Sequence, residues 1–235
     1  AKARFDVATL EARERLETRL RDCEDLLRGV RGLAQANGGL DRTSFRTYLG
    51  SLELERNYPG LMGVAYGIPL PPGGEAAVER RLRVEHGREL RIHPGVGFGD
   101  DAIILFEEPE QSNIRALGFN SSSTADQRAS LLAARDSGGL QATPPMALAQ
   151  APEAGPGFVL RLAIYEGGGI PSTLEGRRRA FSGYANAVFL LNRLAGDASR
   201  RAAADRIRMR LADMSDPGRP RVFFESTGGL AARWW

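Results

Sequence analysis

Few residues in this chain have the types and spacing that catalysis or metal binding requires. His86 and His93 are the only histidines, and neither is accompanied by a cysteine or by paired acids at metal-ligand spacing. The glycine-rich segment 95–99 lacks the following helix and the last glycine of a phosphate-binding loop. The acidic pairs at 100–101 and 107–108 flank an apolar run, a position typical of solvated strand ends. The sequence therefore predicts no catalytic residue, no metal site and no cofactor.

The segment from Asn113 to Pro145 has the composition of a binding-site wall. A polar loop, residues 120–123, follows the apolar triplet 117–119. After the loop, Thr124 and Gln127 have the spacing of a helix capping box, and Gly138 can end the helix in a left-handed conformation. The simpler interpretation of this loop is an ordinary helix start. The alternative is that the loop contacts a bound ligand.

Composition limits the class of protein. The chain has 235 residues, of which 42% are hydrophobic and 26% charged, as in a globular protein of one or two domains. Lys2 is the only lysine, and the arginines alternate with acids instead of clustering, so we expect no nucleic acid partner. Cys23 is the only cysteine, which excludes an internal disulfide.

No stretch approaches the roughly 20 apolar residues that span a bilayer, and no signal peptide opens the chain. The sequence starts inside a helical pattern and stops just after a strand-like run. We therefore expect a piece excised from between flanking segments.

A helix is expected over residues 1–36. Leucine, cysteine and valine residues recur in steps of four and three along it, which is the pattern of a coiled-coil seam. Packing of this stripe on its own domain is one interpretation, and pairing with a second copy is the one that the charged flanks favour. The expected dimer seam consists of Leu16, Leu20, Cys23, Leu27 and Val30.

Strands and short helices alternate after this helix. Apolar runs predict strands at 102–106, 158–165 and 181–191, the first of them central in its sheet, and periodicity predicts helices at 42–56, 75–86 and 198–205. A short strand at 90–93 and a hairpin of 206–213 with 221–225 complete the expected elements. This order indicates an α+β fold with mainly antiparallel sheets.

Four segments in this order resemble the CHASE domain family. They are Tyr58-Pro59-Gly60-Leu61, Ile92-His93-Pro94, Leu117-Gly118-Phe119-Asn120 and Ala133-Ala134-Arg135-Asp136-Ser137-Gly138. The resemblance runs from about residue 24 to 195, and the tail to 225 is compatible with it. The family consists of extracytoplasmic sensor domains of membrane histidine kinases and diguanylate cyclases, and it includes the plant cytokinin receptors.

The resemblance implies a long N-terminal stalk helix followed by tandem PAS-like modules, the membrane-distal one binding a ligand. On this basis 1–57 is the stalk and second helix, 58–166 the distal module and 167–235 the proximal module. The chain would be the periplasmic or extracellular portion of an inner-membrane receptor, with a transmembrane helix on each side. A histidine kinase of a two-component system, or a diguanylate cyclase, would follow in the cytoplasm, so the chain itself would not be an enzyme.

The resemblance also implies the ligand contacts. Asn120 stands where the family usually has an acid, so a donor-rich adenine is expected to bind more weakly and a carbonyl or carboxylate becomes possible. Arg161 could pair with an anion, but alternation along its strand favours the solvent face. The expected ligand-binding residues are Asn120, Thr143, Phe158, Leu160, Leu162, Leu117 and Tyr66.

Three candidate functions are compatible with the sequence. The leading one is a sensor that binds a small ligand and signals through a dimeric stalk helix. The alternative is a dimerisation or protein-interaction module of a membrane receptor that binds no ligand, and a small-molecule hydrolase is a weaker third.

Overall fold

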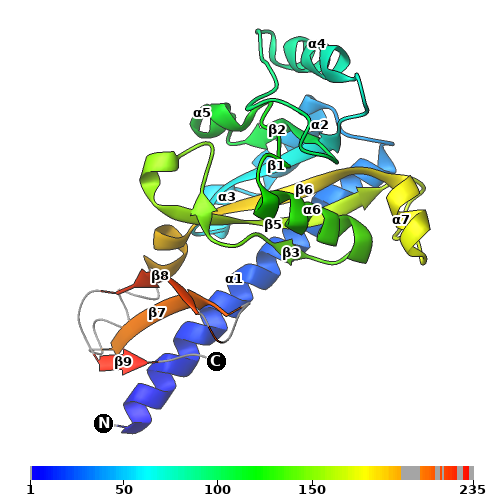
Figure 1. Ribbon diagram of the computed structural model, residues 1–235. Helices are drawn as coiled ribbons and strands as arrows, with labels where there is room; N and C mark the ends of the chain where they lie inside the picture. Colours follow the sequence, from blue (N-terminus) through cyan, green and yellow to red (C-terminus); the bar gives the residue numbers. More distant parts are fainter. Residues whose placement is uncertain (1, 197–206, 215–217, 219, 227–229, 233–235) are drawn as a thin grey trace.

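The computed structural model describes residues 2–196, 207–214, 218, 220–226 and 230–232 (Figure 1). A long helix comes first and strand-rich segments follow, which confirms the predicted α+β class. The helices are α1 (Lys2–Ala36), α2 (Arg42–Ser51), α3 (Leu54–Asn57), α4 (Glu75–His86), α5 (Glu110–Asn113), η1 (Ile114–Ala116), α6 (Ala125–Ser137), η2 (Pro152–Ala154) and α7 (Leu174–Ala180), and residues 191–196 are also helical. The strands are β1 (Leu61–Pro69), β2 (Ala102–Glu108), β3 (Gln141–Ala142), β4 (Met146–Ala147), β5 (Pro156–Tyr165), β6 (Phe181–Leu190), β7 (Ile207–Asp213), β8 (Arg221–Glu225) and β9 (Leu230–Ala232).

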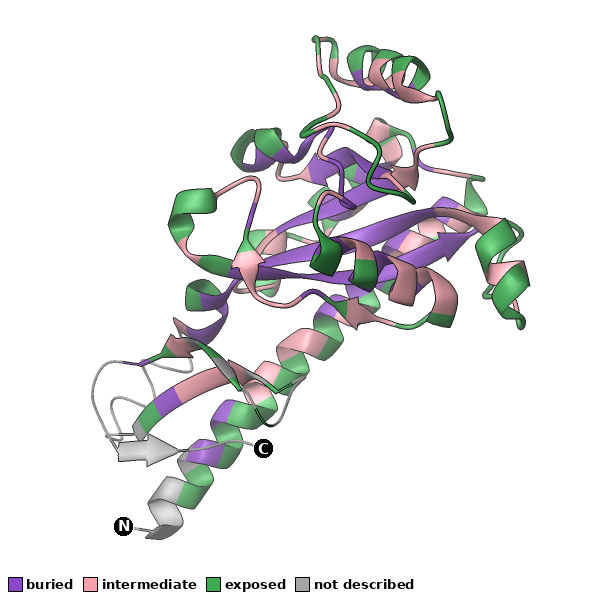
Figure 2. Cartoon of the chain, in the orientation of Figure 1, coloured by how far each residue is buried: buried purple, intermediate pink, exposed green. Residues whose placement is uncertain are grey.

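The main sheet is antiparallel throughout. Its strand order is β2-β1-β6-β5-β3, and β4 also pairs with β5. Strands β5 and β6, ten residues each, lie at its centre and are almost entirely buried on both faces (Figure 2). Helix α1 covers one face, and α6 with neighbouring loops covers the other.

Helix α1 packs on the sheet through the stripe that we expected to form a dimer seam. Cys23, Leu27 and Val30 are at most 2% exposed and belong to the core shared with β5 and β6, while Leu16 and Leu20 pack at its edge. The prediction of a dimer seam is therefore wrong for Cys23, Leu27 and Val30, whose side chains are used in the chain's own core. The spacing that suits a partner helix also suits the chain's own sheet, because both require one continuous apolar stripe.

Strand β2 has a covered edge. The sequence predicts a central strand, but β2 pairs with β1 alone and ends the ladder. Its free side is occupied by the segment after η1: the Ile104 amide donates to the Phe119 carbonyl (3.0 Å) and the Gly118 amide donates to the Ile104 carbonyl (2.9 Å). This cover hides the backbone groups of an edge strand, which otherwise invite pairing with other chains.

The expected strand at 90–93 is reduced to a single bridge between His93 and Phe119. The carbonyl of Gly118 accepts from the amide of His93 (3.0 Å), and the amide of Asn120 donates to the carbonyl of His93 (2.8 Å). The segment therefore supports the covering loop of β2 instead of forming a strand.

The capping residues behave as their types predict. The side chain of Asp41 accepts from the Ser44 amide at the start of α2, and that of Thr124 accepts from the Gln127 amide at the start of α6. Gly138 ends α6 with φ 73°. The helix expected over 42–56 is interrupted at Glu53, whose φ is 47°, so it forms α2 and α3.

A second, three-stranded sheet has the order β8-β7-β9 and lies beside the N-terminal part of α1 (Figure 1). The predicted hairpin is confirmed as β7 and β8, while its tip, 215–217, and the expected helix at 198–205 lie outside the described residues.

The domain boundary expected between 166 and 167 needs correction. Strand β6 follows that boundary but pairs with β1 and β5, so the unit built on the main sheet extends to residue 190 at least.

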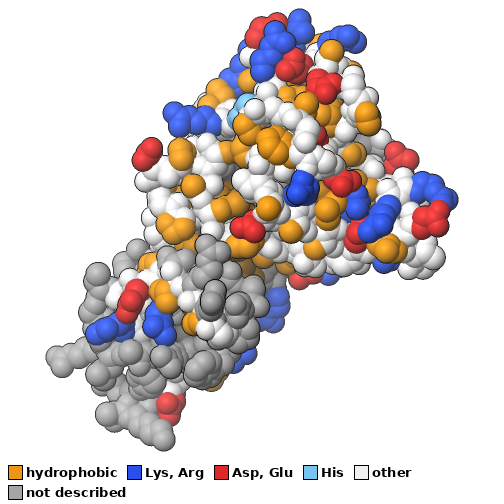
Figure 3. All heavy atoms as spheres, in the orientation of Figure 1, with side chains coloured by type: hydrophobic (Ala, Val, Ile, Leu, Met, Phe, Trp, Pro, Cys, Tyr) orange, Lys and Arg blue, Asp and Glu red, His pale blue; other side chains and the backbone are white. Residues whose placement is uncertain are grey.

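Within the described part of the chain, no helix is both long and apolar enough to span a bilayer. The same residues contain no cluster of three or more histidine, cysteine or acidic side chains that could hold a metal. On the face shown in Figure 3, positive and negative side chains are interspersed over α4 and α7.

The packing of α1 on the sheet can be tested with Leu27→Ala. The side chain of Leu27 is 0% exposed, so its truncation should lower the free energy of unfolding by about 2–5 kcal/mol, measured by urea denaturation. The matched control is Leu10→Ala in the same helix, because Leu10 is 54% exposed and should change stability by only about 0.5 kcal/mol. Similar small effects of both substitutions would contradict this packing.

Candidate ligand-binding site

Three polar side chains line up across the face of the main sheet that is turned away from α1. In the strand register Glu107 of β2 is opposite Ala65 of β1, Ala65 is opposite Asn186 of β6, and Asn186 is opposite Arg161 of β5. Residues directly opposite each other in an antiparallel sheet share a face. We call Glu107, Asn186 and Arg161 the polar row; each is at most 2% exposed.

Arg161 is a buried cation at one end of the row. Its Nη1 donates to the carbonyls of Gln127 (3.1 Å) and Ser121 (3.4 Å), and its Cζ lies 5.8 Å from the centre of the Tyr184 ring. Its Nε has no hydrogen-bond partner, and no carboxylate of the described residues lies within ion-pair distance. Burial lowers the pKa of the Arg161 guanidinium to about 10, which still leaves it charged at neutral pH. The expectation that Arg161 lies on a solvent face is wrong.

Glu107 is a buried acid at the other end. Its Oε1 accepts from the Nε2 of Gln150 (2.8 Å), and its Oε2 has no partner. Burial raises the pKa of the Glu107 carboxyl to about 8, against a smaller opposing effect of the Gln150 hydrogen bond. Glu107 therefore keeps its proton at neutral pH, and the expectation that this acid is solvated is wrong.

Small residues allow the polar side chains to lie close against the sheet. A Cβ at Gly63 would lie 2.8 Å from the Glu107 Oε1 and 2.9 Å from the Asn113 Nδ2, so only glycine fits there without displacing them. Ala65 separates Glu107 from Asn186 with a single methyl group. The Oδ1 atoms of Asn113 and Asn186 are buried and have no partner.

A cavity lies over Arg161 and Asn186. Its volume is about 20 Å³, enough for about one water molecule. Gln150 reaches from its wall to Glu107, so a hydrogen bond links the cavity wall to that end of the row. We call it the polar cavity; it is lined by Ile104, Ala116, Phe119, Ser121, Gln127, Met146, Leu148, Ala149, Gln150, Val159, Arg161, Asn186 and Val188.

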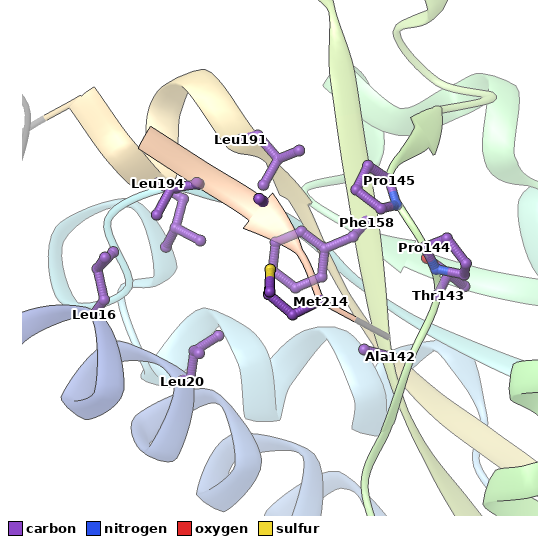
Figure 4. A pocket seen from close by; sticks show the side chains of 12 residues that line it. Leu16, Leu20, Ala142, Thr143, Pro144, Pro145, Phe158, Leu191, Leu194 and Met214 are labelled. Carbon is purple, nitrogen blue, oxygen red and sulfur yellow. The ribbon is translucent and has the colours of Figure 1, made fainter. Parts of the chain in front are cut away.

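A larger hollow lies on the opposite side of β5, between α1 and the second sheet (Figure 4). Its volume is about 520 Å³, and none of its lining residues is charged. We call it the apolar groove; it is lined by Leu16, Leu20, Ala142, Thr143, Pro144, Pro145, Phe158, Leu191, Leu194, Leu211, Ala212 and Met214.

Two of the predicted ligand contacts, Thr143 and Phe158, meet in the apolar groove. The Thr143 hydroxyl oxygen accepts from the Val159 amide (3.0 Å), so it ties β5 to the preceding segment. Phe158 stacks on Phe189, with ring centroids 5.0 Å apart. The groove offers apolar contact and few polar groups to orient a ligand.

Asn120, the central predicted contact, is a structural residue. It is 0% exposed; its Oδ1 accepts from the amides of Ala102 (3.3 Å) and Ser122 (3.1 Å). Its Nδ2 donates to the carbonyl of Gly95 (2.7 Å) and the carboxylate of Asp101 (2.8 Å). Because these bonds use both ends of the amide within the protein, the assignment of Asn120 to the ligand is corrected.

The remaining predicted contacts belong to the protein interior. Leu160 and Leu162 lie in the core with α1, Leu117 is buried, and Tyr66 stacks on Phe106 at 5.9 Å between ring centroids. Tyr66 also borders a separate polar hollow of about 730 Å³ next to the α1–α2 connection. None of these four side chains lines the polar cavity.

The contacts predicted on β5 lie on the face of the strand opposite to the polar cavity. Even-numbered residues such as Leu160 face α1, whereas Val159 and Arg161 face the polar cavity. One signal in the sequence indicates the face of the polar cavity, namely the two polar residues, Arg161 and Asn186, that interrupt two apolar strands. The roles of Glu107 and Gln150 depend on tertiary contacts and carry no such signal.

Comparisons with known proteins agree with this architecture. Residues 38–224 match the CHASE domain. A solved structure titled "Methyl-accepting Chemotaxis protein X" superimposes with a TM-score of 0.51 at 13% sequence identity, covering 90% of this chain and 71% of that one. At this identity the likeness shows a shared fold alone. No curated protein matches the chain.

The buried state of Glu107 predicts a pH dependence of stability. Its carboxyl binds a proton more tightly in the folded chain, with a pKa of about 8 against the ordinary value of 4.5. Its contribution to stability is therefore complete below the ordinary value and is lost as pH rises through about 8. Relative to Glu107→Gln, the wild type should lose up to about 1.4 kcal/mol of unfolding free energy per pH unit between about pH 5.5 and 7.5.

The measurement is urea denaturation of both proteins at several pH values in this window. Glu107→Gln is a suitable reference because it keeps an oxygen that can accept from Gln150, and because all other titrating groups cancel in the difference. A difference that stays constant with pH would mean that Glu107 is ionised in the folded protein.

Proposed function

Because the chain belongs to the CHASE domain family of extracellular sensor domains, we propose that it binds a small ligand in the polar cavity and signals its presence through a membrane receptor. One observation carries the choice of site. The polar row places buried polar atoms without partners, Arg161 Nε and Asn186 Oδ1, on residues that line a cavity.

Unpartnered polar atoms favour a ligand over a purely structural role. A buried polar group without a hydrogen bond costs about 1–3 kcal/mol, so protein interiors rarely keep several of them together. By contrast Asn120, which pairs with the edge of β2, uses both ends of its amide in bonds within the chain. A ligand with matching donors and acceptors would satisfy the row in the same way.

The ligand would enter beneath residues 146–154, which we call the cover loop. Met146, Leu148, Ala149 and Gln150 form one wall of the polar cavity. Its first two residues are β4, which pairs with β5, and the rest is held by the hydrogen bond from Gln150 to Glu107 and by one from the Asn192 Nδ2 to the Ala154 carbonyl (3.2 Å). Since the closed cavity admits about one water molecule, binding requires this loop to move outward.

For signalling, the ligand must bind one conformation more tightly than the other. In the proposed route the main sheet is the membrane-distal PAS-like module, the β7–β9 sheet belongs to the proximal one, and α1 is the stalk that connects them to the membrane. If α1 pairs with a second copy, it does so outside the predicted seam, for example through the exposed Val7 and Leu10. A histidine kinase or diguanylate cyclase in the cytoplasm would receive the signal from this periplasmic domain.

Blocking the cavity should abolish ligand binding. Ala149 lines the cavity on the cover loop, so Ala149→Phe should fill it, whereas Ala147→Phe on the same loop points an equal side chain to solvent. In a thermal-shift screen of a metabolite library, compounds that stabilise the wild type should stabilise Ala147→Phe equally and Ala149→Phe much less. A ligand that shifts all three proteins equally binds elsewhere, and a library without any hit would favour the ligand-free interaction module.

A further inference from the structure

The polar row contains a positive charge for which the described residues provide no negative partner. Arg161 is among the largest fully buried side chains, and all its hydrogen bonds go to neutral backbone carbonyls. Buried charges in proteins are normally paired, because removing an ion from water is costly unless an opposite charge compensates. The Tyr184 ring at 5.8 Å compensates only in part.

We propose that the ligand of the polar cavity is a small organic acid whose carboxylate pairs with Arg161. This inference rests on the proposed function, since it names the chemical class of the ligand at the same site. It extends that function by assigning Arg161 as the residue that determines ligand specificity.

The geometry of the guanidinium suits a carboxylate. Arginine carries five N–H donors in a planar fork that matches two carboxylate oxygens. In Arg161 the two carbonyl bonds involve only Nη1, and Nε is buried without an acceptor. Because Arg161 lines the cavity, an acid inside it could accept from this free side of the fork.

The surroundings select for a single negative charge. Glu107 holds a proton at neutral pH, since burial raises its pKa to about 8, so it neither repels the acid nor attracts a cationic group. The unpartnered Oδ1 of Asn186 can accept a hydrogen bond from a ligand hydroxyl. The rest of the lining is mostly apolar, with Ile104, Val159 and Val188 on the sheet.

The size of the cavity limits the acid. A space of about 20 Å³ expands only as far as the cover loop moves, so short aliphatic acids fit better than dicarboxylates or aromatic acids. A dicarboxylate would also place its second charge against apolar walls, which is unfavourable without another cation. Short monocarboxylates, with or without a hydroxyl or keto group, are therefore the expected class.

The experiment compares each acid with its own amide. Acetate and acetamide, propionate and propionamide, lactate and lactamide, and pyruvate and pyruvamide have nearly equal shapes but differ in charge. At matched ionic strength and neutral pH, at least one acid should raise the melting temperature of the wild type, by roughly 5–10 °C at 100 times its dissociation constant. Its amide should have little effect.

Arg161→Gln should abolish the shift caused by the acid, while Arg91→Gln should keep it, because Arg91 is an exposed arginine paired with Glu79. Circular dichroism establishes that each variant is folded. The comparison of acid with amide needs only the wild type, so it tests the proposal even if Arg161→Gln does not fold.

Three results would overturn the carboxylate proposal: equal shifts by acid and amide, an acid shift that survives in folded Arg161→Gln, or no shift by any acid of the panel. The variants Ala149→Phe and Ala147→Phe distinguish failure of the carboxylate proposal from failure of the proposed sensor function. If uncharged metabolites stabilise the wild type and Ala147→Phe but not Ala149→Phe, the cavity is a sensor site and only the ligand class is wrong.

Discussion

Helix α1 buries one stripe of side chains on β5 and β6, and this contact determines what each face of the sheet can contain. Leu27 and Val30 are inaccessible to solvent because Leu160, Leu162 and Phe189 meet them from the sheet. A helix of this length with charged flanks gains most of its stability from such packing and little from intrinsic propensity. With one face committed to apolar contact, polar residues of the central strands can lie only on the other face, where Arg161 and Asn186 are found.

The polar face departs from the rule that interiors satisfy their own hydrogen bonds. Glu107 and Arg161 are an acid and a base in one buried row, yet they do not form an ion pair, because Ala65 and Asn186 stand between them. Each is held by neutral groups instead, Glu107 by Gln150 and Arg161 by the carbonyls of Ser121 and Gln127. Departures of this kind concentrate at functional sites, where stability is given up for binding.

How much of the fold and of the candidate site can be predicted from the sequence depends on how far apart in the chain the interacting residues are. Local signals predict the helix caps at Asp41, Thr124 and Gly138, the strands β5 and β6, and the β7–β8 hairpin, because each depends on neighbouring residues. The stripe on α1 is equally local, but its partner is not, and the same spacing serves a second helix or a sheet. The faces of β5 are ambiguous for a similar reason, since alternation defines two faces without saying which one lies towards a cavity. Asn120 is buried only because its segment pairs with the edge of β2, a contact between distant parts of the chain.

The alternation of β5 also explains how a ligand on one face could be detected on the other. Arg161 lies between Leu160 and Leu162, whose side chains point in the opposite direction into the core with α1. A rotation or shift of the backbone at Arg161 therefore moves both leucines, and close-packed interiors transmit such movements because they contain little free space. The cover loop belongs to the same path, because β4 within it pairs with the start of β5, where Phe158 borders the apolar groove together with Leu16 and Leu20 of α1. Strand β5 thus connects the polar cavity on one face of the sheet directly to α1 on the other face. A movement along this connection requires no rearrangement of the fold.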